Sequence, residues 1–188
     1  TNKNYADRTG SGTVTITPAP VTITVNNASK VFGEDDPEFT GTVVGLIGSD
    51  SIGTVSYSRV GNDEEVGTYE DVLTASYTNN PNYTVTVNNG DFEITAATGA
   101  ELNITNYSDV YDAEEHSIGV TNVIDGDTVY YSLTNNGTDW STTKPMFTEV
   151  TPGTTVYVKV TNKNYADRTG SGTVTITPAP VTITVNNA

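Results

Sequence analysis

Two runs of acidic residues carry the side chains best suited to hold a cation. The first run comprises Glu34, Asp35, Asp36 and Glu38, and the second lies within residues 112–115. Clustered carboxylates bind hard cations such as Ca²⁺ through their oxygens. Neither run has the D-x-[DN]-x-[DN]-G spacing of a dedicated calcium loop, and charge runs are usually solvated surface. We therefore expect two solvated loops and no cofactor, with calcium at the first run as the less favoured alternative.

His116 is the only histidine and would have to be the base of any catalytic triad. A triad also needs a nucleophile beside the histidine and an acid that orients it. The sequence contains no cysteine and no G-x-S-x-G nucleophile motif. His116 is therefore expected to be a surface-loop residue, and the chain is not predicted to be an enzyme.

Trp140 is the only tryptophan and lies in a turn-rich stretch, residues 135–143. Packing in a core or between domains is the commoner role of such a residue. Aromatic side chains are also enriched among the residues that dominate binding interfaces. An exposed anchor that stacks on a sugar or contacts a partner is therefore kept as the alternative.

The charge and the composition exclude several partners. Eight Lys and Arg against 23 Asp and Glu give a net charge of −15, which would repel the backbone of a nucleic acid. No apolar run approaches the roughly 20 residues that span a membrane, so we expect no membrane contact in this segment. Thr, Asn, Val, Gly and Tyr are abundant, a usage typical of strands and turns.

The elements that position these side chains are predicted to be strands. Val21, Ile23 and Val25 alternate with threonine, the period that puts one face of a strand in a core and the other toward water. The same alternation places Lys159 on a polar face, where its ammonium is expected to reach solvent. Short strands at this spacing predict an all-β fold of tandem small β-sandwich domains, Ig-like and arranged end to end. The predicted strands include residues 12–17, 21–25, 54–59, 72–77, 83–87, 91–95, 101–105, 128–133, 156–160 and 181–185.

A long repeat sets the domain organisation. Residues 1–28 recur without a substitution at residues 161–188, so the period is 160 residues. A weaker repeat lies inside the period, because the pattern N-x-N-Y occurs at residues 2–5, 80–83 and 162–165. Self-similarity of this kind indicates an array of structural units, here with two sister domains in each period.

The two repeats together give the expected domain boundaries. Residues 19–97 are predicted to form one β domain, of A type, and residues 98–178 a sister domain of B type. Residues 1–18 are expected to close a preceding B-type domain, and residues 179–188 to open a following A-type domain. Unpaired strands expose a backbone edge that is prone to pairing. We therefore expect both end strands to be held by a neighbouring copy, through array continuity or strand exchange.

The joint between a B-type and an A-type domain is short and rich in proline. Proline fixes its own φ and biases the residue before it toward extended geometry, so this joint is expected to be a semi-rigid spacer. The other junction, residues 96–100, has a glycine and no proline and is expected to be looser. The predicted linker residues are Pro18, Ala19, Pro20, Pro178, Ala179 and Pro180.

Five short motifs follow one another within residues 19–97: V-F-G at 31–33, D-P at 36–37, G-T-Y at 67–69, N-Y at 82–83 and I-T-A at 94–96. Through these motifs, residues 19–97 resemble the MBG-type, YGX-like tandem repeats of bacterial surface adhesins. Phe32 stands where that pattern more often has tyrosine, and residues 98–178 look like a diverged relative. The resemblance implies an extracellular β-rich module, Ig-like or alternatively β-grasp-like, and it carries over no catalytic or ligand-binding residue.

These patterns favour a structural role over a catalytic one. The expected function is that of a repeat in a long extracellular fibre or adhesin stalk on a bacterial cell surface, acting as a stiff spacer. Its expected partners are the neighbouring identical repeats and other copies of the chain. The alternative is a binding module that gains avidity from repetition, with a glycan or a host protein as its unidentified ligand.

Overall fold

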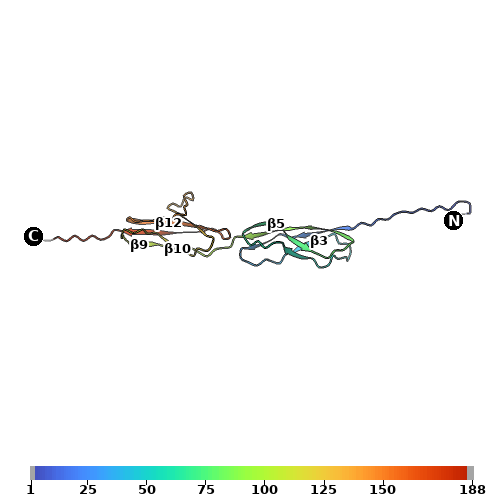
Figure 1. Ribbon diagram of the computed structural model, residues 1–188, viewed down its shortest axis with the longest axis horizontal. Helices are drawn as coiled ribbons and strands as arrows, with labels where there is room; N and C mark the ends of the chain where they lie inside the picture. Colours follow the sequence, from blue (N-terminus) through green and yellow to red (C-terminus); the bar gives the residue numbers. More distant parts are fainter. Residues whose placement is uncertain (1–2, 186–188) are drawn as a thin grey trace. The chain divides into compact units, whose positions relative to one another are not determined.

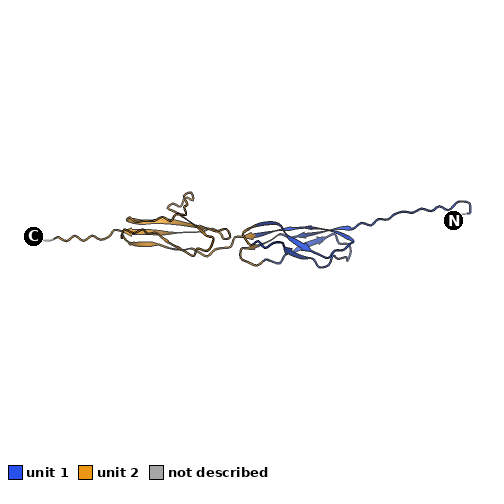
Figure 2. Ribbon diagram, in the orientation of Figure 1, with its two compact units in different colours: residues 1–29, 36–63, 68–93 blue, residues 30–35, 64–67, 94–188 orange. Residues whose placement is uncertain are grey.

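The computed structural model describes residues 3–185, in which strands occur but no helix (Figure 1). The all-β prediction is confirmed. A β-grasp fold needs a helix on its sheet, so that alternative does not describe these residues. Contacts divide the chain into two compact units (Figure 2). The first unit is Thr1–Ser29, Asp36–Asp63 and Thr68–Glu93, and the second unit is Lys30–Asp35, Glu64–Gly67 and Ile94–Ala188.

A three-stranded sheet in the first unit is built around β1 (Ala19–Val25). β1 pairs antiparallel with β3 (Gly41–Val44) and parallel with β6 (Tyr83–Asn88). The alternation of the sequence decides which face is buried, since Val21, Ile23 and Val25 are 1%, 0% and 3% exposed.

A second sheet has the strand order β2-β7-β5-β4. Its members are β2 (Ala28–Val31), β7 (Gly90–Thr95), β5 (Gly67–Ser76) and β4 (Ser56–Arg59). Tyr57 of β4 and Ala75 of β5 pack against the cluster that contains Val21 and Ile23 of β1. Apolar faces of two sheets thus meet in one core, the arrangement of a β-sandwich.

The second unit contains a long hairpin of β12 (Thr151–Thr161) and β13 (Arg168–Thr177). β11 (Thr128–Ser132) pairs antiparallel with β12, and β9 (Tyr107–Val110) pairs parallel with β13. The resulting order is β11-β12-β13-β9. A separate two-stranded sheet is formed by β8 (Asn103–Thr105) and β10 (Gly119–Thr121).

The two sheets of the second unit approach each other closely at glycines of β13. A Cβ on Gly172 would lie 2.9 Å from Cγ2 of Ile118 and 3.0 Å from Cγ2 of Ile104. Ile118 belongs to a core cluster with Val156, Val158 and Val160, and Ile104 packs against it. Glycine in a strand interior often marks such a close approach.

Two predicted strands, residues 12–17 and 181–185, are absent. Val14 and Ile16 are 88% and 91% exposed, whereas the identical Val174 and Ile176 of β13 are 0% and 2% exposed. The difference lies in the partners, because β13 is paired on both edges while no described strand pairs with residues 12–17. That such segments are held by a neighbouring copy stays a prediction.

The sequence also left four strands unpredicted. β2 and β3 have four residues each, β9 has four and β10 has three. Runs this short barely complete one alternation, so the period-two signal cannot identify them.

Candidate binding site

The loop after β11 is tied down by a small polar network. Ser132 is 4% exposed, and its Oγ accepts a hydrogen bond from Thr134 N at 3.0 Å and lies 3.1 Å from Asp139 Oδ1. Thr134 Oγ1 donates to the Asp139 carboxylate at 2.8 Å. These hydroxyl hydrogen bonds, that from Thr134 first, hold the pKa of Asp139 below its ordinary value. The ionised carboxylate therefore organises the loop at neutral pH.

Backbone hydrogen bonds then return the loop to the strand that it left. Tyr131 N donates to Ser141 O at 2.7 Å, and Ser141 N donates to Tyr131 O at 2.9 Å. Trp140, immediately before this bridge, is half-buried. Trp140 is thus held near β11 by its neighbour in the chain and by the network of Ser132.

Lys159 of β12 lies between two aromatic rings. Its Nζ is 5.2 Å from the centroid of the Trp140 ring and 5.4 Å from that of Tyr130. Both distances suit cation–π attraction. Tyr130 stands directly opposite Lys159 in the register of β11 and β12. Lys159 lies on the face of β12 opposite the buried valines, as predicted; the residue is half-buried, and its ammonium lies close to both rings.

The first acidic run supplies one ion pair, through Asp36. Asp36 accepts hydrogen bonds from Arg59 Nε at 2.8 Å and from Arg59 Nη2 at 3.2 Å. The guanidinium also stands 4.8 Å from the ring centroid of Phe92, and Phe39 packs edge-on against the same ring. Asp36 is therefore occupied in fixing the loop to β4 and β7.

The remaining acidic candidates show no gathering around a common point. Glu34, Asp35 and Glu38 are exposed. Across residues 3–185, no three His, Asp or Glu side chains come together in a group that could hold a metal ion. The preference for solvated loops over a calcium site stays a prediction.

His116 is more than the surface-loop residue that the sequence predicted. Its ring stacks on Tyr107 with centroids 4.1 Å apart, and its Nε2 lies 2.9 Å from Asp112 Oδ1. His116 and Phe147 exchange two backbone hydrogen bonds of 2.9 Å. The hydrogen bond from His116, followed by that from Glu114 N, lowers the pKa of Asp112. His116 therefore links β9, through the Tyr107 ring, to the loop before β12, through the Phe147 backbone.

The sequence analysis did not predict the buried ion pair between Arg168 and Asp127. The two side chains are 8% and 2% exposed. Burial alone would raise the pKa of Asp127, but hydrogen bonds from Ile124 N, Asn162 Nδ2 and Arg168 outweigh it, so the pKa is lowered. Two carbonyl oxygens, those of Ala100 and Asn122, accept from Arg168 Nη1 at 3.2 and 3.1 Å. Asp127 directly follows a turn at Asp125 and Gly126, and that turn is the sequence feature nearest to this site.

The junction expected to be loose is hydrogen-bonded inside the second unit. Ala97 N donates to Asn164 O at 3.1 Å, and Ala166 N donates to Ala97 O at 2.9 Å. A Cβ on Gly99 would lie 2.8 Å from Cδ of Arg168. The backbone of residues 164–166 thus pairs with this segment on both sides of Ala97.

Two of the predicted linker residues lie in a strand, whereas Pro18, Pro178, Ala179 and Pro180 lie outside strands. Ala19 and Pro20, expected in the linker, are the first residues of β1. Ala19 N donates to Asn82 O on the side of β6, and pairing with β3 starts only at Thr22. Because consecutive N–H groups of a strand point to opposite edges, the missing N–H of Pro20 falls where no ladder bond is lost.

One comparison with known proteins bears on residues 21–93. The family model of the MBG domain (YGX type) matches residues 21–93, so the resemblance seen in the sequence is confirmed there. MBG domains are found in surface adhesin-like repeat proteins. No curated protein matches the chain, and that residues 98–178 are a diverged relative stays a prediction. Among the described residues, no helix is long and apolar enough to cross a membrane.

Proposed function

We propose that this chain is a structural repeat of a long bacterial surface fibre or adhesin stalk, in which it acts as a stiff extracellular spacer. The occurrence of MBG domains in surface adhesin-like repeat proteins supports the setting. The letter-for-letter recurrence of residues 1–28 at 161–188 supports the array. The stiffness of such an array depends on the joint between one domain and the next.

The observation that carries the proposal is where the two strands that would flank the joint end and begin. β13 ends at Thr177 and β1 begins at Ala19. Since residues 8–25 and 168–185 have the same sequence, the joint of a continuous array reads Thr-Pro-Ala with a strand on either side. One residue, the counterpart of Pro18 and Pro178, then separates the two strands.

A one-residue joint of this type is stiff for two reasons. The pyrrolidine ring fixes φ of the proline and disfavours helical geometry in the threonine before it. The flanking residues are held by the ladders of their own sheets, which leaves few free torsions. The high negative charge of the chain adds solubility and keeps neighbouring fibres apart.

Small-angle scattering on proteins of one, two and three periods tests this function. We expect the maximum dimension to grow by a constant increment with each added period. Replacing the counterparts of Pro18 by glycine should broaden the distance distribution without lowering the thermal midpoint, because glycine restores backbone freedom at the joint. Pro37→Gly, in an exposed loop, is the matched control and should leave the scattering unchanged. A compact particle, or an increment that falls as periods are added, would contradict the spacer.

A binding role is the second candidate. It is favoured by one observation, the aromatic pair that flanks Lys159 in the second unit.

A further inference from the structure

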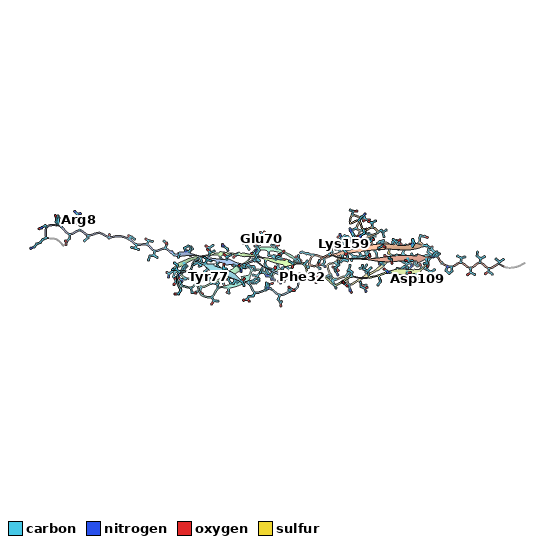
Figure 3. All side chains as sticks on the ribbon, turned by 180° about the vertical axis from the view of Figure 1, so that it is seen from behind. Arg8, Phe32, Glu70, Tyr77, Asp109 and Lys159 are labelled. Atoms are coloured by element: carbon cyan, nitrogen blue, oxygen red, sulfur yellow. The ribbon has the colours of Figure 1, made fainter. Side chains whose placement is uncertain are left out.

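The outer face of the β11-β12-β13 sheet is polar and carries aromatic rings. Val156, Val158 and Val160 are buried on the inner face, so the alternation of β12 turns Tyr157 and Lys159 outward. Tyr157 stands opposite Ser171 of β13 in the register. The outer face therefore carries hydroxyl groups as well as the ammonium of Lys159, the residue that Figure 3 labels on this unit.

Lys159 differs from four other cations of the chain because no carboxylate is paired with it. The structure gives it no ion pair within residues 3–185, although the chain has 23 Asp and Glu. An ammonium has three N–H donors, and the two ring faces satisfy its charge only in part. The cations that do pair with carboxylates are Lys30 with Glu64, Arg59 with Asp36, Lys163 with Glu65 and Arg168 with Asp127.

The aromatic side of this cluster is preorganised. The backbone on either side of Trp140 is placed by the Ser132, Thr134 and Asp139 network and by the Tyr131 bridge to Ser141, and the indole itself contacts Lys159. A group that is ordered before a ligand arrives loses little entropy when it binds. Side chains held in this way are suited to recognition as well as to packing.

We propose that the cluster of Tyr130, Trp140 and Lys159 is a binding site for a saccharide that carries a carboxylate, such as a uronic acid. The Lys159 ammonium accepts the carboxylate as a charge-assisted hydrogen-bond partner. The exposed part of the indole packs against the apolar C–H face of the sugar ring. Hydroxyls of the outer sheet face, including those of Tyr157 and Ser171, bind the sugar hydroxyls.

The charge of the chain favours a saccharide over an acidic peptide. A net charge of −15 repels a ligand with many negative charges, whereas a sugar with one carboxylate satisfies the single ammonium and presents otherwise neutral hydroxyls. The site lies outside residues 21–93 and does not depend on the spacer function. In an array it would recur once per period, which raises avidity without any new contact.

The fluorescence of Trp140, the only tryptophan, reports directly on this site. We expect sodium glucuronate to cause a saturable change in the emission of the full chain. Glucose and sodium acetate, each at equal concentration and ionic strength, should cause no such change. Glucose has the sugar ring without the carboxylate, and acetate has the carboxylate without the sugar ring. Lys159→Gln should weaken glucuronate binding by about tenfold or more, the loss of one charge-assisted hydrogen bond.

Two further variants keep the test decisive. Lys144→Gln removes a positive charge in the loop before β12 and should leave the titration unchanged. Lys159→Arg retains the cation and should still bind, even if Lys159→Gln disturbs the fold. An unchanged titration with Lys159→Gln, an equal response to acetate, or tighter binding of an oligoglutamate peptide would each overturn the proposal.

Discussion

Arg8 and Arg168 occupy the same position in two copies of one sequence, yet their surroundings are opposite. Arg8 is exposed on an extended segment, where Figure 3 labels it, whereas Arg168 is buried in an ion pair with Asp127. A buried charge is tolerated only when it is paired and hydrogen-bonded. The second unit provides that partner and residues 3–18 do not.

Arg168→Met should therefore destabilise the second unit, and Arg8→Met should not. Removing one member of a buried pair leaves the other uncompensated and costs about 3–5 kcal/mol. Chemical denaturation of both variants, followed through Trp140, measures the difference. Equal midpoints for Arg168→Met and Arg8→Met would contradict this account of the pair.

The same site should make the second unit sensitive to acid. The pKa of Asp127 is lower in the folded state than its ordinary value of about 3.9. Its ionised form thus stabilises the fold above that value, and the contribution is lost as the pH falls through the lowered pKa. Unfolding measured from neutral to acidic pH should show a smaller acid-induced loss for Asp127→Asn than for the parent chain. If the parent chain and Asp127→Asn lose the same stability in acid, Asp127 is not a source of the acid sensitivity.

At the scale of the element, the repeated string shows what makes a strand. Residues 168–177 form β13 because β12 and β9 accept and donate along both of its edges, while the identical residues 8–17 have no such neighbours. Intrinsic β propensity is therefore insufficient, as expected if strand stability comes mainly from packing and pairing. The alternation correctly predicted strands with a buried face, such as β1 and β12, and wrongly predicted residues 12–17.

Gly172 offers a direct test of how the sheets of the second unit pack. Gly172→Ala would place a Cβ 2.9 Å from Ile118 and 3.0 Å from Ile104, so the small sheet has to shift. Overpacking of a core typically costs about 1–3 kcal/mol. Gly12→Ala, the same substitution in the other copy, meets nothing within 4 Å.

Thermal unfolding of these two variants should give a lower midpoint only for Gly172→Ala. If Gly172→Ala leaves the midpoint unchanged or raises it, the β8 and β10 sheet does not pack as closely as described.

Sequence reasoning identified the residues of the candidate site but not the contact between them. Trp140 stood out because it is unique, and Lys159 was placed on the correct face of its strand. Their meeting depends on a loop that returns to β11 through Ser132 and Asp139, and local patterns do not report such a return. The Arg168 pair escaped for the same reason, since its partner lies far away in the sequence.

At the scale of the whole molecule, the proposed stiffness depends on repetition. In the proposed array, each copied segment would supply the last strand of one domain and the first strand of the next, and the proline between these strands would set the stiffness of the array. The absence of cysteine leaves the chain free for site-specific spin labels at introduced cysteines. Two exposed positions near the joint, Ser171 of β13 and Thr24 of β1, suit that purpose.

The most direct test places one label at Ser171→Cys of one period and the other at the Thr24→Cys counterpart beyond the next proline joint. Pulsed dipolar spectroscopy on a protein of two periods then measures the distance between them. A stiff joint predicts a single narrow distribution that broadens when the intervening proline becomes glycine. A broad distribution in the parent protein, unchanged by that substitution, would contradict the spacer function.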